Sequence, residues 1–329
     1  MSGVPGGARE RVFLCRNYTA ALRGLCMLMI VFSHTANEFM DIMEQCGAVW
    51  TLESGRYATG VFFFLSGYGI TLSMGRNTVG GAYLWRHLLR LLLPYLIFWA
   101  AYAAAGLVVR GTLDAALLLD FVSLKMPFVD AWFFRTILVV YVVYITLAMR
   151  FGRRAGVILA SAVAVYVPAM AMCGMGSWWW DTIACFPLGI AYAAFRPLRR
   201  GLRLPAMAGL VLVFAAVQVF CPSAVLRLVA LPVVLCVFLA HLSTAVVAMP
   251  RLPLLSFVGG NSLHFYFMEQ IPIDYCDSEA AGFAAYVVGG IVLTAALACL
   301  GSRVEKALSG RLLGSPASAG GGANKGVDA

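Results

Sequence analysis

Apolar segments recur along almost the whole chain. Ten runs are long enough to cross a bilayer, which takes about 20 apolar residues in a helix. They lie at residues 18–38, 57–74, 84–108, 131–149, 155–173, 179–195, 204–220, 224–243, 253–273 and 281–300. A further run at 113–123 is too short to span and predicts an interfacial segment on the outer side. The pattern therefore predicts an all-α, single-domain bundle of about ten transmembrane helices.

Composition supports a membrane protein. Of the 329 residues, 62% are hydrophobic and only 12% are charged, which is far more apolar than a soluble domain. The first run is longer than the apolar core of a signal peptide, contains Arg23 and lacks a small-residue cleavage site after it, so we expect it to remain a span. The sequence thus predicts a transmembrane domain at 17–305 between a Gly-rich basic tail at 1–16 and a disordered, low-complexity tail at 306–329.

The basic residues predict the orientation. If the N-terminus is cytoplasmic, 18 of the 24 Lys and Arg residues fall in inner segments, and the outer segments keep only Arg56, Arg110, Lys125 and Arg227. Because cytoplasmic loops carry the excess of positive charge, both termini are predicted to be cytoplasmic. The net charge of +9 follows from this topology. It does not indicate nucleic-acid binding, since no soluble basic domain is present to carry it.

The first predicted span contains two ionisable residues, Arg23 and His34. They are eleven positions apart, so on a helix they lie within about 20° of one face and roughly 16 Å apart along it. An arginine in hydrocarbon normally faces the bundle interior, a water-filled cavity or a ligand. Arg23 at the inner headgroups and His34 at the outer interface is the alternative interpretation.

The first span resembles the signature of the integral-membrane acyltransferase-3 family, because ten residues separate Arg23 from His34. The segment FFFLSGYG at 62–69, which follows it, resembles the same signature. Four further segments fit in the same order: RHLLRLLLPY (86–95), WFFRTILVVY (132–141), FPLGIAY (186–192) and LSFVGGNSLHFYFMEQIPI (255–273). The resemblance implies an acyl-CoA-dependent O-acyltransferase for which Arg23 and His34 are needed. Its expected reaction moves a short acyl group, with acetyl expected, to a hydroxyl of an envelope or exported saccharide. The expected location is the bacterial cytoplasmic membrane.

His34 is the candidate base for this reaction. An imidazole with an ordinary pKa of about 6.5 can take the proton of an alcohol as it attacks a thioester at neutral pH. Glu38 and Asn37 lie four and three residues further on, so either is expected to reach the ring and select its tautomer. Glu38 is therefore a third candidate catalytic residue, unless it lies in water at the outer interface. His87 and His241 are predicted to be interfacial, and His264 to be a hydrogen-bonded structural residue.

The donor is predicted to enter from the cytoplasm. Arg86 and Arg90 begin the third span, where they can bind the phosphates of acyl-CoA or act as ordinary inside-positive anchors. The pantetheine arm would then pass Arg23 and present its thioester towards His34. Ser66, Gly67 and Tyr68 are expected to line this path, although small residues in spans more often mediate helix contacts.

The acceptor is predicted to bind at the outer side. Trp132, Trp179, Asp181 and Glu269 are the candidate substrate-binding residues. Trp179 belongs to an outer aromatic belt in the alternative interpretation. Asp181, like Asp130 and Asp274, begins or ends a span where it would face an outer cavity. Glu269 falls inside a predicted span and needs a partner, for which Arg23 or Arg135 would serve.

Two rival functions remain open. A transporter would use Arg23, His34 and Glu269 as a polar relay, although the two halves show no obvious inverted repeat. A purely structural scaffold leaves the ionisable groups in the spans unexplained. No metal site, P-loop or serine-hydrolase elbow is expected, because the cysteines form no paired cluster and the corresponding motifs are absent from the sequence. The predicted partners are acyl-CoA, a hydroxylated saccharide and the lipid bilayer, and a homo-oligomer is compatible with the sequence.

Overall fold

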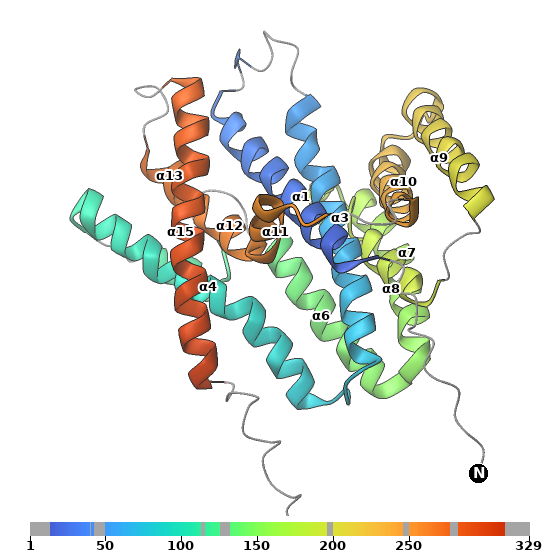
Figure 1. Ribbon diagram of the computed structural model, residues 1–329, viewed down its shortest axis with the longest axis horizontal. Helices are drawn as coiled ribbons and strands as arrows, with labels where there is room; N and C mark the ends of the chain where they lie inside the picture. The colour runs from blue at the N-terminus through green and yellow to red at the C-terminus, as the bar shows by residue number, and fades with distance from the viewer. Residues whose placement is uncertain are drawn as a thin grey trace, which may run out of the picture.

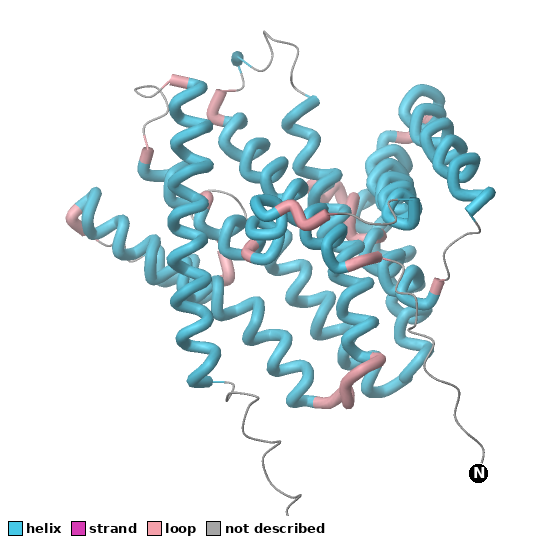
Figure 2. The backbone as a smooth tube through the Cα atoms, in the orientation of Figure 1, coloured by secondary structure: helices cyan, strands magenta, loops and turns pink. Residues whose placement is uncertain are grey.

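The computed structural model describes residues 14–39, 41–42, 50–112, 116–125, 132–195, 200–245, 250–276 and 282–312. Within these ranges the chain forms helices and no strand (Figures 1 and 2). The helices are α1 (Arg16–Asn37), α3 (Trp50–Met74), α4 (Gly81–Arg110), α5 (Ala116–Val122), α6 (Trp132–Phe151), α7 (Ala155–Met172), α8 (Cys185–Ala194), α9 (Arg200–Phe220), α10 (Ala224–Ala245), α11 (Pro253–Gly260), α12 (Ser262–Met268), α13 (Gln270–Tyr275) and α15 (Phe283–Leu312), with short 3-10 turns η1 (Gly152–Arg154) and η2 (Ser177–Trp179).

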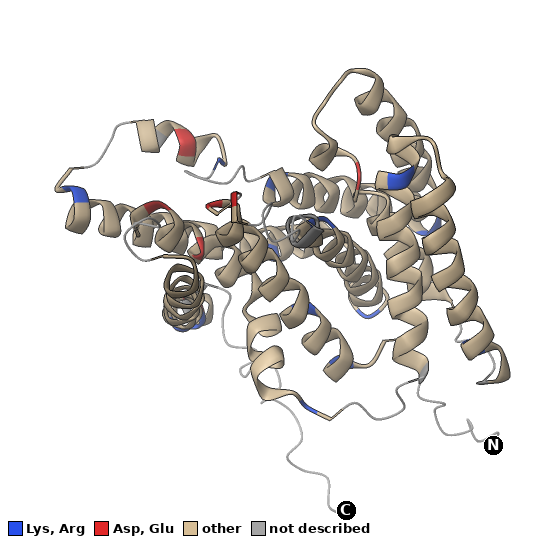
Figure 3. Ribbon diagram, turned by 90° about the horizontal axis from the view of Figure 1, so that it is seen from above, with Lys and Arg blue, Asp and Glu red and all other residues tan. Residues whose placement is uncertain are grey.

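Seven helical stretches of the described residues are long and apolar enough to cross a membrane. One of them, Trp132–Met172, contains both predicted spans 131–149 and 155–173. Gly152 has a φ of +56° there, and the chain turns so that α6 packs against α7. The all-α, multi-span prediction is confirmed. Figure 3 shows how few charged residues the ribbon carries.

Two of the ten predicted spans are not continuous helices of membrane length. The run 179–195 contains only the ten-residue helix α8. The run 253–273 is divided into α11, α12 and α13, with breaks at Asn261 and Glu269. Pro272 has no backbone N–H to donate to the carbonyl three or four residues before it, which weakens the helix around Glu269. Non-helical backbone at membrane depth is tolerated where protein covers it, and every residue from His264 to Ile273 is buried.

The broken segment lies in the middle of the molecule. In Figure 1, α12 lies between α1 and α15 and contacts both of these long helices, and α11 packs against α1. The approach of α11 to α1 is close, because a Cβ at Gly24 would overlap the carbonyl oxygen of Leu255. Small residues allow such contacts between membrane helices.

Aromatic rings fill the core between α4, α6 and α12. The ring centroids of Tyr95 and Phe134 are 5.0 Å apart, and those of Phe134 and Phe267 are 5.1 Å apart. At the edge of the molecule, α9 packs beside α10 and has no buried side chain among its described residues (Figure 1). The apolar outer face of α9 is therefore suited to lipid.

The N-terminal boundary of the domain is close to the prediction, whereas the C-terminal boundary lies further along the chain than predicted. Helix α1 begins at Arg16, close to the predicted start of the domain at residue 17. Helix α15 continues to Leu312, so residues 306–312 are helical and not part of a disordered tail. Within the short run at 113–123, residues Ala116–Val122 form the seven-residue helix α5, which is too short to span a membrane. Residues 1–13 and 313–329, which hold most of the predicted tails, lie outside the described residues.

Candidate active site

The centre of the candidate site is a pair formed by His34 and Glu269. The Nδ1 atom of His34, near the end of α1, lies 2.8 Å from the Oε1 atom of Glu269, between α12 and α13. The Glu269 side chain is fully buried, whereas 20% of the His34 side chain is exposed. A buried carboxylate needs a hydrogen-bonding partner, and here the imidazole supplies it. The partner of Glu269 is thus His34, and the predicted pairing with Arg23 or Arg135 is wrong.

Glu38 does not take the position that its spacing suggested. It lies exposed at the C-terminal end of α1, and the carboxylate at the His34 ring belongs to Glu269. Asn37 is also exposed, but it lines the cavity beside His34. Helical spacing places Asn37 and Glu38 one turn from His34. The contact with Glu269, from a distant part of the chain, decides which group orients the imidazole.

His34 opens into a cavity of about 290 Å³ at the C-terminal end of α1, which we call the outer cavity. Two of the four predicted acceptor residues, Trp132 and Asp181, line it. Trp178, which is 50% exposed, also lines it, whereas Trp179 is not among the lining residues. The side chain of Trp179 instead lies against Arg135, whose guanidinium carbon is 5.2 Å from the ring centroid.

Asp181 is held by an arginine across the outer cavity. Its Oδ2 atom lies 2.9 Å from the Nε atom of Arg56 on α3, and both residues line the cavity. Asp181 belongs to the loop between η2 and α8, outside the long apolar helices. Burial raises the pKa of its carboxyl group to about 6, and the neighbouring Arg56 opposes this increase. Asp181 therefore changes charge within a physiological range of pH.

The other two outer aspartates have different positions. Asp274, in α13, accepts hydrogen bonds from the hydroxyl group of Tyr102 and from Nη2 of Arg110, the latter at 3.1 Å. Tyr275 stacks against the same Arg110, whose guanidinium carbon is 4.7 Å from the ring centroid. This cluster links the outer end of α4 to α13. Asp130 lies outside the described residues.

Arg23 lies between two further cavities. A middle cavity of about 160 Å³ is lined by Arg23, Ser66 and Tyr141, and it shares Ile30, Phe133 and Tyr266 with the outer cavity. An inner cavity of about 510 Å³ is lined by Arg23, Tyr68 and Gly69 together with Arg16 and Arg76. Adjacent cavities share lining residues, so the three follow α1 from Arg16 to Asn37.

Arg23 reaches across from α1 to α3 beside Gly69. A Cβ atom at Gly69 would lie 3.8 Å from Nη2 of Arg23, which is an ordinary van der Waals contact. Tyr68 lines the inner cavity, and its hydroxyl group accepts a hydrogen bond of 3.1 Å from the backbone N–H of Leu14. Three of the residues predicted to line the donor path, Arg23, Ser66 and Tyr68, thus do line the cavities along α1.

Gly67 has a different role. A Cβ atom there would overlap the carbonyl oxygen of Phe186, and a Cβ atom at Gly189 would overlap that of Phe64. The two glycines therefore allow α3 and α8 to pack closely, as the alternative interpretation of small residues proposed. Gly67 is not among the lining residues of the three cavities.

The arginines at the inner rim also differ from expectation. Arg86 and Arg90 are exposed on α4 and do not line the three cavities along α1. Arg16 and Arg76 line the inner cavity instead. In the sequence these two resemble any other inner arginine, and only the packing of α1 against α3 separates them from topology anchors.

The remaining histidines lie outside these three cavities. His264 Nε2 lies 2.8 Å from Oε2 of Glu305 on α15, consistent with the predicted hydrogen-bonded structural residue. His87 Nδ1 lies 2.9 Å from the carbonyl oxygen of Tyr83, and His241 lies beside Tyr192. Within the described ranges, no group of three or more His, Cys, Asp and Glu side chains is arranged to hold a metal ion.

A family model described as an acyltransferase domain matches residues 17–303, which is most of the chain. No curated protein and no solved structure matches the chain. The family match covers the helices that line the three cavities, namely α1 from its second residue, α3, α4, α6 and α12.

Proposed function

Since the chain belongs to the acyltransferase-3 family and is a multi-pass membrane acyltransferase, we propose that it transfers a short acyl group from acyl-CoA to a saccharide hydroxyl. The single observation that carries this proposal is the His34–Glu269 pair, which faces a cavity large enough for part of a sugar. Acetyl is the acyl group we propose. The acceptor is a saccharide of the cell envelope or one destined for export.

The His34–Glu269 pair supplies a base in a fixed orientation. When Nδ1 carries the hydrogen and donates it to Glu269, Nε2 is left with a free lone pair. The acidic partner also stabilises the imidazolium that forms during the reaction. This is the arrangement by which a carboxylate orients a catalytic histidine in acyl transfer.

The proposed step balances without any cofactor beyond the donor. Nε2 of His34 takes the proton of the acceptor hydroxyl as its oxygen attacks the thioester carbonyl carbon. The C–O bond forms, the C–S bond breaks, and the imidazolium returns the proton to the departing thiolate of CoA. The products are an O-acyl ester and free CoA, and His34 is again neutral.

The inner and middle cavities provide the path for the donor. Arg16 and Arg76 line the inner cavity and can bind the CoA phosphates by charge-assisted hydrogen bonds. Arg23 lines both this cavity and the middle one, so it lies where the thin pantetheine arm would pass towards His34. The aromatic side chains of Phe62, Phe133 and Tyr141 provide apolar walls for that arm.

Charge asymmetry supports the proposed orientation. The residues of the inner cavity belong to the segments that are rich in arginine, and cytoplasmic segments of membrane proteins have this composition. We therefore place the N-terminus and the donor in the cytoplasm, and the His34 cavity towards the opposite face. The bacterial cytoplasmic membrane is the proposed location, and a homo-oligomer is compatible with it.

The test uses sealed vesicles that contain the full-length protein in a known orientation. Acetyl-CoA labelled in the acetyl group is supplied on the arginine-rich face, together with a mixture of saccharide acceptors on the other face. We expect label to appear on a saccharide, with release of one free thiol for each acetyl group transferred. Donor supplied on the opposite face should give no product.

A transporter would give a different result in the same vesicles. It would accumulate an intact solute and release no thiol. Solute uptake without thiol release, in protein with intact Arg23, His34 and Glu269, would overturn the proposed acyl transfer and favour the polar relay. Vesicles with the His34→Ala variant provide the matched control for non-enzymatic thioester hydrolysis.

A further inference from the structure

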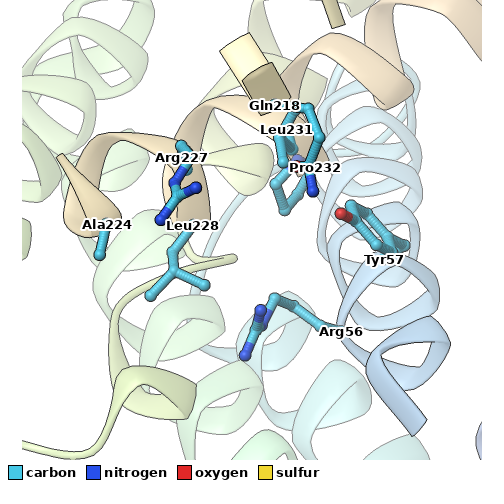
Figure 4. A pocket seen from close by; sticks show the side chains of 8 residues that line it. All are labelled: Arg56, Tyr57, Gln218, Ala224, Arg227, Leu228, Leu231 and Pro232. Carbon is cyan, nitrogen blue, oxygen red and sulfur yellow. The ribbon is translucent and has the colours of Figure 1, made fainter. Parts of the chain in front are cut away.

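A fourth cavity, separate from the three along α1, lies between α3 and the α9–α10 pair (Figure 4). Its volume is about 220 Å³. Its polar lining consists of Arg56 and Tyr57 from α3, Gln218 from α9 and Arg227 from α10. We call it the two-arginine pocket, after Arg56 and Arg227. Its remaining walls are the side chains of Ala224, Leu228, Leu231 and Pro232.

Arg227 brings a positive charge to this pocket without a neutralising neighbour. It lies in the first turn of α10, is partly buried and takes part in no salt bridge among the described residues. The first residue of α10, Ala224, lines the same pocket, so the positive end of the helix dipole faces it as well. An arginine at the membrane boundary without an acidic partner is suited to an anionic ligand.

Arg56 contributes a second guanidinium group from the opposite side. Its Nε atom binds Asp181, but a guanidinium group has five N–H donors, and the terminal ones remain for another acceptor. In Figure 4 the side chain of Arg56 extends from α3 towards Leu228, and that of Arg227 lies beside Leu228. The forked donors of arginine match the oxygens of a phosphate or carboxylate group.

The same Arg56 also lines the outer cavity that contains His34. The two-arginine pocket and the candidate active site are therefore neighbours with one residue in common. An anionic group bound at Arg227 and Arg56 would therefore lie at the wall that the pocket shares with the outer cavity. The hydroxyl of Tyr57 and the amide of Gln218 are suited to hydrogen bonds with sugar hydroxyls along the pocket.

We propose that the two-arginine pocket binds a phosphate or carboxylate group of the acyl acceptor, so that the acceptor is an anionic saccharide and not a neutral one. This inference rests on the proposed function, because the shared Arg56 is what connects the pocket to the acceptor side of the reaction. The headgroup of an anionic phospholipid has the same chemistry, and the experiment must separate the two sources.

The first arm measures binding and does not depend on turnover. Full-length protein in nanodiscs of neutral lipid is titrated with glucose 1-phosphate and with glucose. We expect glucose 1-phosphate to bind at least tenfold more tightly, because charge-assisted hydrogen bonds to arginine replace contacts with water. Arg227→Gln should remove this preference, and Arg227→Lys should retain part of it. Equal binding of the two sugars, or a preference that survives Arg227→Gln, would overturn the proposal.

Arg154→Gln is the matched control. Arg154 is an exposed arginine in η1, at the turn between α6 and α7, and it lines none of the four cavities. Its loss should leave the preference for glucose 1-phosphate unchanged. An equal loss in both variants would mean that net charge and not the pocket causes the preference, which would also overturn the proposal.

The second arm identifies the source of the anion and separates this inference from the proposed function. Nanodiscs with phosphatidylglycerol should leave glucose 1-phosphate binding within twofold. If the lipid abolishes that binding and is itself retained through Arg227, the occupant is a headgroup and the acceptor assignment fails. The two proposals fail on different measurements. Absence of thiol release from acetyl-CoA in the wild type would refute the proposed acyl transfer, whereas the preference for glucose 1-phosphate over glucose is measured by binding and tests only the two-arginine pocket. Arg227→Gln should raise the KM for an anionic acceptor and leave that for acetyl-CoA unchanged.

Discussion

At the scale of single residues, the site depends on one imidazole whose orientation is determined by a partner 235 positions away in the chain. A histidine has two neutral tautomers, and in the proposed reaction the one with its hydrogen on Nδ1 leaves a lone pair at Nε2 for the acceptor. Glu269 favours that tautomer by accepting the hydrogen of Nδ1 at its Oε1 atom. The other oxygen of this fully buried carboxylate, Oε2, has no hydrogen-bond partner among the described residues.

The most direct consequence concerns substitution of His34. His34→Ala should lower the rate of acyl transfer at least a hundredfold, which is the usual contribution of a general base. The KM for acetyl-CoA should change little, because the inner cavity proposed to bind the CoA phosphates lies at the other end of α1. The measurement is thiol release by purified protein in lipid.

His87→Ala is the matched control, since His87 bonds only to a backbone carbonyl on its own helix. This variant should retain wild-type activity. Residual turnover within tenfold of wild type in His34→Ala would remove the imidazole from the mechanism.

Asp181 predicts a pH dependence of stability. Its pKa is about 6 in the folded protein and 3.8 in the unfolded chain, so the folded state holds this proton more tightly. The contribution of Asp181 to stability is therefore fully present below pH 3.8 and is lost as the pH rises through about 6. Over this window, wild type should lose stability with rising pH relative to Asp181→Asn. Thermal unfolding of both proteins from pH 4 to 7 tests this.

The difference between the two proteins is the informative quantity, because other carboxyl groups titrate in both. A constant difference in Tm across the window would show that Asp181 keeps one charge state throughout. Because the raised pKa means that burial disfavours the ionised carboxyl group more than Arg56 favours it, Asp181→Asn is expected to be at least as stable as wild type at pH 7.

At the scale of elements, two features hold the site in place. The segment from α11 to α13 is broken at Asn261 and Glu269, and it places the Glu269 side chain in the interior of the molecule. A continuous helix of the predicted length has no such break at Glu269. Close packing of α3 on α8 then fixes the helix that carries Ser66, Gly69 and Arg56.

The α3–α8 contact predicts a loss of stability on substitution. Gly67→Ala places a methyl group against the backbone of Phe186, and backbone can move aside less readily than a side chain. We expect a destabilisation of about 1–3 kcal/mol, the usual range for overpacking. The measurement is the Tm of the purified protein in detergent, followed by its activity at a temperature where it remains folded.

Gly209→Ala provides the control for the effect of glycine itself. Gly209 lies in α9, and a Cβ atom there meets nothing within 4 Å. Its replacement should leave the Tm unchanged or raise it slightly, because alanine favours the helix. An equal loss in both variants would assign the effect to glycine in helices and not to the α3–α8 contact.

At the scale of the whole molecule, the cavities along α1 divide into an arginine-rich end and an end with His34. The donor should therefore be recognised at one end and the acceptor at the other. This separation is what the proposed transfer requires, in which acyl-CoA comes from the cytoplasm and the saccharide is on the other side.

The inner end predicts which arginines bind the donor. Arg16→Ala and Arg76→Ala should each weaken acetyl-CoA binding about tenfold or more, as expected for loss of a charge-assisted hydrogen bond. Arg86→Ala and Arg90→Ala test the sequence-based prediction in the same assay. On the structure, we expect their effect to be smaller, because both side chains are exposed on α4.

Titration of all four variants with acetyl-CoA in neutral nanodiscs makes this comparison. Binding that depends on Arg86 and Arg90, but not on Arg16 and Arg76, would place the CoA phosphates on the surface of α4. It would also contradict entry of the donor through the inner cavity.

The sequence by itself determined the all-helical class, the multi-span membrane character and the family, because these follow from the length and period of apolar runs and from motifs of adjacent residues. It also identified Arg23 and His34, because their spacing on one helix is a local property. Local spacing equally suggested Glu38 as the group that orients His34.

Only the tertiary structure decided that Glu269 takes that role, that Gly67 serves helix packing, and that Arg16 and Arg76 line the inner cavity. Each of these depends on which faces of distant helices meet. When a helix is apolar all round, its sequence does not show which face packs against a neighbouring helix. The sequence did not predict the breaks at Asn261 and Glu269 for a similar reason. The length of an apolar run does not show whether neighbouring helices cover a gap in its backbone hydrogen bonds.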